Sequence, residues 1–316
     1  MDQDNVKNVL EFVKRHHTSL YEFIEPSKLR LHPNYSVCII GASRGIGEHI
    51  AYAYAAAGAH RIILAGRPSS QTLLGSVAAK ARTLNSNPGA SVTISSVDLA
   101  SSSEVADLAR MVRAQIPRLD AVVFNAGFSG PVTLRIDDGE PADFRTCVDV
   151  NYLGAYHVAH WFLPLLRRDG ATSVGVGDGD GGEGAGAGAF IVVSAMAALI
   201  TRGPIANTGY CVSKMAQLRL VEMVAEQYGK EGVLAVAVHP GAVLTEMAMQ
   251  APEEFAPYLI DSPALCGGFC VWLCAEKEKR RWMNGRLLSA TWDVEELLSK
   301  HKEIVEKDLL KFRMAI

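Results

Sequence analysis

Short apolar runs that alternate with longer helical patterns constrain the fold of this chain more than any other feature. From residue 36 onward these runs are rich in Val and Ile, and most gaps between them carry apolar residues at helical spacing. We expect strands near residues 37–41, 61–65, 91–97, 121–125, 190–194 and 234–239, and a short last one near 286–290. Runs that are apolar almost throughout are typical of a parallel sheet with helices on both faces. The sequence therefore predicts an α/β fold with a single doubly wound parallel sheet.

Three segments lie outside this alternation. Apolar residues in 1–35 follow roughly one helical stripe, which predicts an N-terminal helical arm ahead of a single domain at 36–316. The arm could pack on the domain or contribute to a subunit contact. Residues 175–189 are almost entirely Gly, Ala, Asp and Glu, so we expect a mobile surface insertion without chemistry. Residues 294–312 alternate charges with Leu and Ile at helical spacing, which predicts a C-terminal helix.

Composition excludes several classes of partner. The 316 residues are 49% hydrophobic, and the formal net charge of −3 gives no basic surface for nucleic acid. No run approaches the roughly 20 apolar residues that span a bilayer, and the acidic start is unlike a signal peptide. We therefore expect a cytoplasmic protein without a membrane partner. Cys266, Cys270 and Cys274 recur at every fourth position without other ligands, so we interpret them as a core stripe and expect no metal site.

A glycine-rich turn follows the first predicted strand. The segment from Gly41 to Gly47 reads Gly-Ala-Ser-Arg-Gly-Ile-Gly, and helical spacing resumes at Ile50. Glycine lets a backbone approach a pyrophosphate closely, and the N-terminus of the next helix offers free N–H groups and a partial positive charge. The strand, turn and helix in this order indicate a nucleotide-binding turn.

Tyr210 and Lys214 lie four residues apart, so a helix places both on one face. A phenol beside an ammonium group suggests an acid/base pair, although an exposed helical face without function gives the same spacing. Other motifs accompany the pair. Asn125-Ala126-Gly127 follows the fourth predicted strand, and Ser194 closes the fifth.

In this order the motifs resemble the short-chain dehydrogenase/reductase family, over roughly residues 36–292. The pattern as a whole is similar to fungal reductases of secondary metabolism. The resemblance implies a Rossmann-type fold, a nicotinamide cofactor and hydride transfer between a ketone and a secondary alcohol. One departure is Ile40, where the family commonly has Thr. The interval from Ser194 to Tyr210 is also longer than usual, and a turn at residues 202–204 can absorb the difference.

The resemblance assigns four catalytic residues. Tyr210 would exchange a proton with the substrate oxygen, and Lys214 would stabilise the phenolate, lower the pKa of the phenol and hold the nicotinamide ribose. Ser194 would orient the substrate oxygen, and Asn151 would help hold a water that relays protons to the lysine. Plainer roles remain open, since Ser194 could end a strand and Asn151 could be a polar residue on a helix surface.

The end of the second predicted strand bears on the choice of cofactor. An acidic residue there would bind the ribose 2′-hydroxyl and repel a 2′-phosphate, but Gly66 and Arg67 stand at this point. Arg44, inside the glycine turn, matches the position that clamps a 2′-phosphate in similar enzymes. Two guanidinium groups without a carboxylate favour NADP(H) over NAD(H). Each arginine taken singly could also be an ordinary surface residue.

Further cofactor contacts are carried over from the family. Asp98 matches the position that binds the adenine, although it could also be a plain helix cap. The turn beginning at Asn125 would pass beneath the ribose, and Val243 and Thr245 would hold the carboxamide. The full predicted set is Gly41, Ser43, Arg44, Gly45, Ile46, Gly47, Arg67, Asp98, Asn125, Ala126, Gly127, Tyr210, Lys214, Pro240, Gly241, Val243 and Thr245.

Residues 246–263 match the substrate lid of the family and are rich in methionine, aromatic residues and proline. They favour a medium-sized, largely apolar ketone or alcohol as the substrate, although core packing would use the same residues. Two other functions stay open. The same scaffold could catalyse a redox-neutral isomerisation, dehydration or cyclisation, or it could bind NADP(H) as a sensor without turnover. By resemblance we expect a homo-oligomer, either a dimer or a tetramer.

Overall fold

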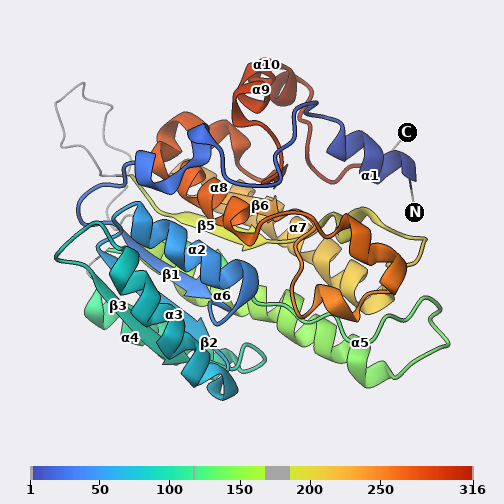
Figure 1. Cartoon of the computed structure of the whole chain (residues 1–316), viewed down its shortest axis with the longest axis horizontal. Coiled ribbons are helices and arrows are strands. Elements are labelled where there is room, and N and C mark those ends of the chain that lie inside the picture. Colours follow the sequence, from blue (N-terminus) through green and yellow to red (C-terminus); the bar gives the residue numbers. More distant parts are fainter. Residues whose placement is uncertain (1–2, 117, 168–185, 315–316) are drawn as a thin grey trace.

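A seven-stranded parallel sheet forms the centre of the molecule. The computed structural model describes residues 3–116, 118–167 and 186–314. The strand order is β3-β2-β1-β4-β5-β6-β7, and every neighbouring pair is parallel (Figure 1). The strands are β1 Ser36–Ile40, β2 Arg61–Gly66, β3 Ser91–Ser96, β4 Ala121–Phe124, β5 Ala189–Val193, β6 Leu234–His239 and β7 Leu287–Ser289. The predicted α/β fold with a doubly wound parallel sheet is confirmed, and each strand lies within about two residues of its expected place.

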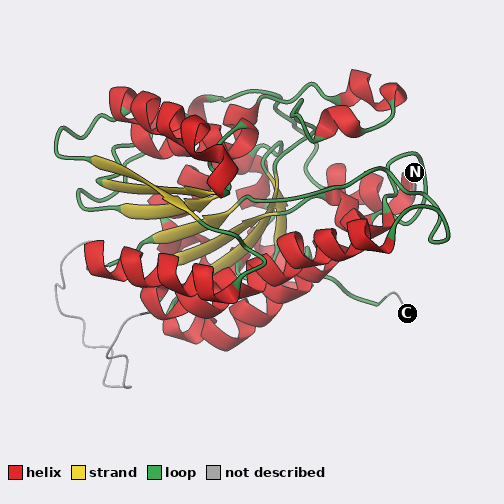
Figure 2. Ribbon diagram, turned by 90° about the horizontal axis from the view of Figure 1, so that it is seen from below, coloured by secondary structure: helices red, strands yellow, loops and turns green. Residues whose placement is uncertain are grey.

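Helices cover both faces of this sheet (Figure 2). One face packs against α2, α3 and α8, and the other against α4, α6 and α7. The principal helices are α1 Gln3–Leu10, α2 Gly45–Ala56, α3 Gln71–Leu84, α4 Ser102–Gln115, α5 Pro141–Cys147, α6 Gly154–Leu166, α7 Thr208–Tyr228, α8 Pro263–Ala275, α9 Val294–Ser299 and α10 His301–Glu306. A π-helical turn, Val148–Leu153, joins α5 to α6.

Alternation along each strand divides the core in two. In β1, Val37 and Ile39 pack with the cluster around α2 and α8, whereas Cys38 and Ile40 pack with the cluster around α4 and α6. Because successive side chains of a strand point to opposite faces, a strand covered on both sides must be apolar at every position. This explains why the strand signals in the sequence are continuous runs.

The sheet reverses its winding between β1 and β4. From β1 the chain moves outward to β2 and β3, then returns to β4 on the other side and continues to β7. The loops that follow β1 and β4 therefore diverge, and a crevice at such a switch point is where doubly wound folds bind ligands. The glycine-rich turn follows β1, and the Asn125 turn follows β4.

The N-terminal arm differs from its prediction. The helix expected within residues 1–35 ends at Leu10, and the chain continues as irregular backbone with two short 3₁₀ turns, Glu22–Ile24 and Pro26–Lys28. The reason is that the backbone of the arm bonds to a distant segment. His17 N–H donates to the Thr291 carbonyl at 2.8 Å, and the Asp293 N–H donates to the Arg15 carbonyl at 3.0 Å. The arm thus packs on the rest of the chain.

Trp292 stabilises this contact between the N-terminal arm and residues 291–293. Its side chain is fully buried, and its indole N–H donates to the Leu10 carbonyl at 3.2 Å. The Tyr21 hydroxyl donates to the Trp292 carbonyl at 3.2 Å and accepts from the Val294 N–H at 2.9 Å. Asp293 forms an ion pair with Arg15 and a hydrogen bond with the His17 ring. The backbone hydrogen bonds, the buried indole and the contacts of Asp293 together explain why the arm is not helical beyond Leu10.

The C-terminal segment also departs from the expected helix over 294–312. Two short helices, α9 and α10, end at Glu306, and Asp308 and Leu310 adopt positive φ angles of 47° and 64°. The tail bonds to the last strand instead of to itself. The Leu287 N–H donates to the Leu310 carbonyl at 2.9 Å, and the buried Arg286 guanidinium donates to the Leu309 carbonyl at 2.8 Å.

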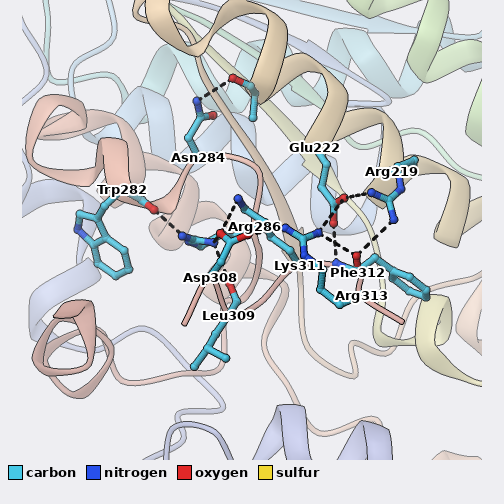
Figure 3. Close-up of polar contacts among 11 residues, drawn as sticks. Arg219, Glu222, Trp282, Asn284, Arg286, Asp308, Leu309, Lys311, Phe312 and Arg313 are labelled. Carbon is cyan, nitrogen blue, oxygen red and sulfur yellow. Dashed lines mark hydrogen bonds and ion pairs between the residues drawn. The ribbon is translucent and has the colours of Figure 1, made fainter. Parts of the chain in front are cut away.

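Figure 3 shows how the side chains around this tail converge. Arg286 also pairs with Asp308 at 3.0 Å, and the Phe312 N–H donates to the Glu222 carboxylate of α7 at 2.6 Å. Arg219, one turn earlier on α7, donates to the Phe312 carbonyl at 3.3 Å. These bonds to α7 and β7 offset the cost of the two left-handed residues.

Three other expectations concern segments away from the sheet edge. The Gly-rich segment at 175–189 lies outside the described residues up to residue 185. The stripe of Cys266, Cys270 and Cys274 is buried in α8, and the residues searched hold no group of three or more metal-ligating side chains. Within the part of the chain that the structure describes, no helix has the length and apolar character that a bilayer crossing needs.

Candidate functional site

The glycine turn after β1 is held by very close backbone contacts. Gly41 has φ +84°, and a Cβ atom there would lie 2.6 Å from the Ala126 nitrogen. A methyl group on Gly47 would overlap the Gly41 carbonyl oxygen and lie 2.5 Å from the Asn125 amide nitrogen. Only glycine fits these positions without displacing backbone, so the turn needs its glycines for packing as well as for access to a ligand.

Asn125 ties this turn to the exit of β4. Its side-chain amide donates to the Gly41 carbonyl at 2.9 Å, and the Asn125 and Ala126 N–H groups both bond to the Ile40 carbonyl. The resemblance placed this motif beneath a ribose. In the structure its side chain supports the glycine turn, and the two predicted cofactor segments form one unit.

The N-terminus of α2 is open to an anion. Arg44 stands at its N-cap with an extended backbone, and among the described residues no side chain caps the first turn. The free N–H groups of a helix N-terminus attract phosphate. Arg44 itself forms an ion pair with Glu246, which lies at the start of the predicted lid. Arg67 is exposed directly after β2, with its side chain available to solvent.

The Asp98 side chain makes a local turn. Its carboxylate accepts from the Ala100 N–H at 3.0 Å, while the Asp98 N–H donates to Glu104 at 2.8 Å. Ser101, not Asp98, is the N-cap of α4 and accepts from the Glu104 N–H. Asp98 therefore fixes the chain after β3 and stays exposed at the same edge of the sheet as Arg67.

Lys214 reaches from α7 to the carboxyl end of β5. Its ammonium nitrogen donates to the Val193 carbonyl at 3.1 Å, and the side chain is buried. Ser194 is the next residue, and its hydroxyl lies 3.5 Å from the Lys214 carbonyl. The Ser194 N–H bonds to the Val238 carbonyl at 2.8 Å, which fixes the serine between β5 and β6. The structure thus brings Ser194 and Lys214 together.

Tyr210 and Lys214 are adjacent on α7, with the lysine nitrogen 5.6 Å from the centre of the phenol ring. Burial lowers the pKa of Lys214 to about 7. Burial also raises the pKa of Tyr210 above its ordinary value, with smaller contributions from Cys211 and Cys147. Burial alone sets the direction of this shift, so a lowering of the phenol pKa by Lys214 stays a prediction.

Asn151 lies fully buried in the π-helical turn. Its side chain accepts from the Phe128 N–H and donates to the Phe128 carbonyl, both at 2.7 Å, and it also donates to the Ser213 hydroxyl at 2.9 Å. Its main-chain carbonyl oxygen accepts from the Gln217 side chain at 2.6 Å. Asn151 is therefore neither a surface polar residue nor free, and it joins the Asn125 turn to α7.

The segment from Pro240 to Thr245 leads into the lid. Gly241 has φ +97°, and a Cβ atom there would meet the Asp261 carboxylate at 2.6 Å. Asp261 accepts from the Ala242 N–H at 2.6 Å, and a β-bridge joins it to Val243, which is buried. Burial raises the pKa of Asp261 despite this bond. Residues 244–260 thus form a loop whose two ends are tied together.

This loop carries the apolar surface predicted for the lid. It contains two 3₁₀ turns, Ala248–Gln250 and Glu253–Tyr258, and Met249, Tyr258 and Ile260 are each more than 60% exposed. These side chains are available to contact a ligand or another surface.

Sequence reasoning gave no individual role to four residues around this site: Gln217, His239, Glu246 and Asp261. Gln217 lies at the next helical turn after Lys214, so continuing the Tyr210 stripe along α7 would have found it. His239 ends β6, accepts from the Met196 N–H at 3.3 Å, and has its pKa lowered to about 4 by burial. Glu246 and Asp261 act through contacts far along the chain, and no local pattern signals them.

Gly47→Ala should destabilise the protein by about 1–3 kcal/mol, because the added methyl overlaps the Gly41 carbonyl and the chain must shift. Chemical denaturation measures the free energy of unfolding. Gly75→Ala is the matched control, since nothing lies within 4 Å of a Cβ at this α3 position and alanine is the better helix former. Equal stability of the two variants would contradict the close contact at Gly47.

Comparison with known proteins places this geometry in a family. The sequence pattern of the short chain dehydrogenases matches residues 35–255. The chain is 34% identical to the short chain dehydrogenase pgmD of Aspergillus terreus over 318 residues, 97% of this chain and 95% of that protein. It is also 34% identical to the short chain dehydrogenase mpl6 of Monascus purpureus over 305 residues, 96% of this chain and 97% of that protein. The predicted likeness to fungal members of the family is confirmed.

The fold is also similar to solved structures. A short chain dehydrogenase of Escherichia coli CFT073, crystallised in complex with NADPH, superposes with a TM-score of 0.69 at 25% identity. The match covers 84% of this chain and 98% of that one. With the family pattern over more than half of its length and relatives aligned over almost all of it, this chain belongs to the short-chain dehydrogenase/reductase family of oxidoreductases.

Proposed function

We propose that this protein is an NADP(H)-dependent oxidoreductase that interconverts a ketone and a secondary alcohol, with Tyr210 as proton donor and acceptor. The observation that carries the proposal is the buried pair of Tyr210 and Lys214, which stands beside Ser194 at the carboxyl end of β5. Burying a half-neutral amine beside a protonated phenol lowers the stability of the fold. Such pairs are typical of sites where a proton is exchanged.

The residues at the switch point fit a dinucleotide with a 2′-phosphate. The glycine turn gives the backbone close access, the N-terminus of α2 is uncapped, and Arg67 is exposed at the end of β2 where no carboxylate stands. Arg44 offers a second guanidinium on the other side of the turn. A relative of similar fold binds NADPH, in agreement with this choice.

When bound, the nicotinamide would supply or accept the hydride. In reduction, Tyr210 would give its proton to the carbonyl oxygen as negative charge develops there. Lys214, when protonated, would stabilise the resulting phenolate, and Ser194 would donate to the same substrate oxygen. Asn151 would hold the Phe128 loop in place below the site, since its side chain is already occupied by that loop.

The exposed methionine and aromatic side chains of residues 246–263 support a medium-sized, largely apolar metabolite as the substrate. The relatives pgmD and mpl6 come from fungi, which agrees with a place in secondary metabolism. We further expect a homo-oligomer that acts in the cytoplasm. Exposed Val212, Met215 and Met223 form an apolar stripe along α7 that suits a subunit contact, and the sedimentation mass of the purified protein tests it.

The direct test is consumption of NADPH and of NADH, followed by absorbance, with a panel of apolar ketones and quinones. We expect turnover with NADPH, and we expect Arg67→Ala to weaken NADPH binding by about tenfold while leaving NADH unchanged, because a charge-assisted contact to phosphate is lost. Arg110→Ala, on the exposed surface of α4, is the matched control.

Two rival functions predict other results. A redox-neutral isomerase, dehydratase or cyclase would convert its substrate without net change in NADPH absorbance, and a sensor would bind NADPH without converting any substrate. Either outcome across a broad panel would overturn the proposed oxidoreduction. An equal loss of NADH and NADPH binding in Arg67→Ala would refute the proposed phosphate contact.

A further inference from the structure

The chain that enters the lid passes between two of the predicted cofactor-binding segments. We call residues 245–247 the strap. The Thr245 methyl carbon lies 3.4 Å from the position of a Cβ on Gly45, at the nucleotide end of the groove. The Met247 methyl lies 3.5 Å from the corresponding position on Gly127, which is itself 3.8 Å from the Lys214 nitrogen. The strap therefore reaches from the glycine turn to the catalytic lysine.

Glu246, at the centre of the strap, forms an ion pair with Arg44. The two side chains are about half exposed, and the residues are 202 positions apart in the sequence. The contact is thus a tertiary one that ties the lid to the glycine turn. Arg44 is also the guanidinium that the proposed function assigns to the 2′-phosphate, and a carboxylate already holds it.

We propose that Glu246 determines cofactor specificity, because its carboxylate competes with the 2′-phosphate of NADP(H) for Arg44. This inference rests on the proposed function. A phosphate dianion attracts a guanidinium more strongly than a single carboxylate does, so NADP(H) displaces Glu246. NAD(H) has a hydroxyl at this position and leaves the Arg44–Glu246 pair intact.

The exchange also links recognition of the phosphate to the lid. The Thr245 hydroxyl accepts from the Ala248 N–H at 3.1 Å, and the Met249 N–H donates to the Thr245 carbonyl at 3.0 Å, so the strap and the following turn form one hydrogen-bonded unit. The far end of the lid stays tied at Asp261. Freeing Glu246 therefore removes the contact between the strap and the glycine turn, while the bridge between Val243 and Asp261 continues to hold the two ends of the loop together.

The size of the effect follows from the exposure of the pair. Ion pairs between exposed side chains contribute at most about 1 kcal/mol, which corresponds to roughly a fivefold change in a dissociation constant. We expect Glu246→Gln to tighten NADPH binding two- to fivefold and to leave NADH binding unchanged, as measured by cofactor fluorescence titration of the full-length protein. Preference for the phosphorylated cofactor should rise by the same factor.

Two further variants make this test specific. Glu253→Gln removes the same charge from an exposed position of the same loop and should not alter the ratio of the two dissociation constants. In an Arg44→Gln background, Glu246→Gln should no longer tighten NADPH binding, because the contested guanidinium is gone. Such a double-mutant cycle isolates the pairwise contribution.

The outcomes separate this proposal from the proposed function. If the unaltered protein binds NADPH no more tightly than NADH, the cofactor assignment fails and the competition fails with it. If NADPH is preferred but Glu246→Gln leaves the ratio unchanged, or tightens both cofactors equally, the competition alone is refuted. If the effect of Glu246→Gln persists without Arg44, the carboxylate acts on the cofactor by general repulsion, and the proposal is overturned.

Discussion

Tyr210→Phe is expected to lower the rate of carbonyl reduction by about 10²- to 10⁴-fold, the range that a positioned proton donor contributes. The hydroxyl is the only group removed, and the ring can keep its place on α7 beside Lys214. NADPH binding should stay within about twofold of the unaltered protein, since the lost hydroxyl acts on the substrate oxygen in the transition state. Single-turnover kinetics and cofactor titration measure the two quantities separately.

Tyr156→Phe provides the matched control, because this tyrosine is 47% exposed on α6 and belongs to no part of the site. It should reduce substrate at the unaltered rate. Full activity of Tyr210→Phe would mean that the proton comes from elsewhere, for example from solvent. A loss of NADPH binding in step with the loss of rate would mean that the hydroxyl acts only through the cofactor contact predicted from the sequence, and the role of proton donor would be refuted.

Lys214→Met should have two opposite effects, a loss of activity of about 10² or more and a gain in stability. The activity falls because no cation remains to stabilise the Tyr210 phenolate. The stability rises because a buried amine with a lowered pKa opposes folding, and methionine fills the same space without that cost. At pH 6 the lowered pKa of Lys214 corresponds to a gain of at most about 5 kcal/mol in the free energy of unfolding.

The pH dependence fixes the sign of this prediction. Folding lowers the pKa of Lys214 from 10.5 to about 7, so between these values the unfolded chain binds more protons than the folded one. The buried lysine therefore destabilises the fold by its full amount below about pH 7, and this destabilisation disappears as the pH rises toward 10. The advantage of Lys214→Met should shrink over the same window.

Urea denaturation at pH 6 and pH 9 measures both values, with Lys230→Met as a control at an exposed position. A variant that is less stable than the unaltered protein at pH 6 would show that the ammonium group is well satisfied by Val193 and is no burden to the fold. A gain of equal size at both pH values would assign the effect to packing instead.

The strands could be predicted because burial on both faces requires an apolar side chain at every position of a strand. Ile39 and Ile40 point in opposite directions and are both apolar, so five residues are enough to recognise the element. The two ends of the chain could not be predicted in the same way. Helical spacing in the arm gives no sign of Trp292, which lies near the other end of the sequence and forms hydrogen bonds with the arm.

In the candidate site, too, local features could be predicted from the sequence and contacts between distant segments could not. The glycine turn and the Tyr210–Lys214 pair are local patterns, and their geometry follows from one turn and one helix. The bonds from Gln217 to Asn151, from Asp261 to Ala242 and from Glu246 to Arg44 span 66, 19 and 202 positions. The direction of the pKa shift at Tyr210 could also not be predicted from the sequence, because desolvation depends on everything that packs around the phenol.

The covering of β7 by both ends of the chain has a consequence for the unit that folds. A strand at the edge of a sheet presents unpaired N–H and C=O groups, which other chains can pair with and aggregate upon. Here the tail bonds to β7 through Leu310 and Leu287, and a bridge from His16 to Trp292 secures the backbone just beyond it. The nucleotide-binding core alone would leave that edge bare. The cooperative unit is therefore the core together with its two ends, and the ends protect the β7 edge from pairing with the strands of other chains.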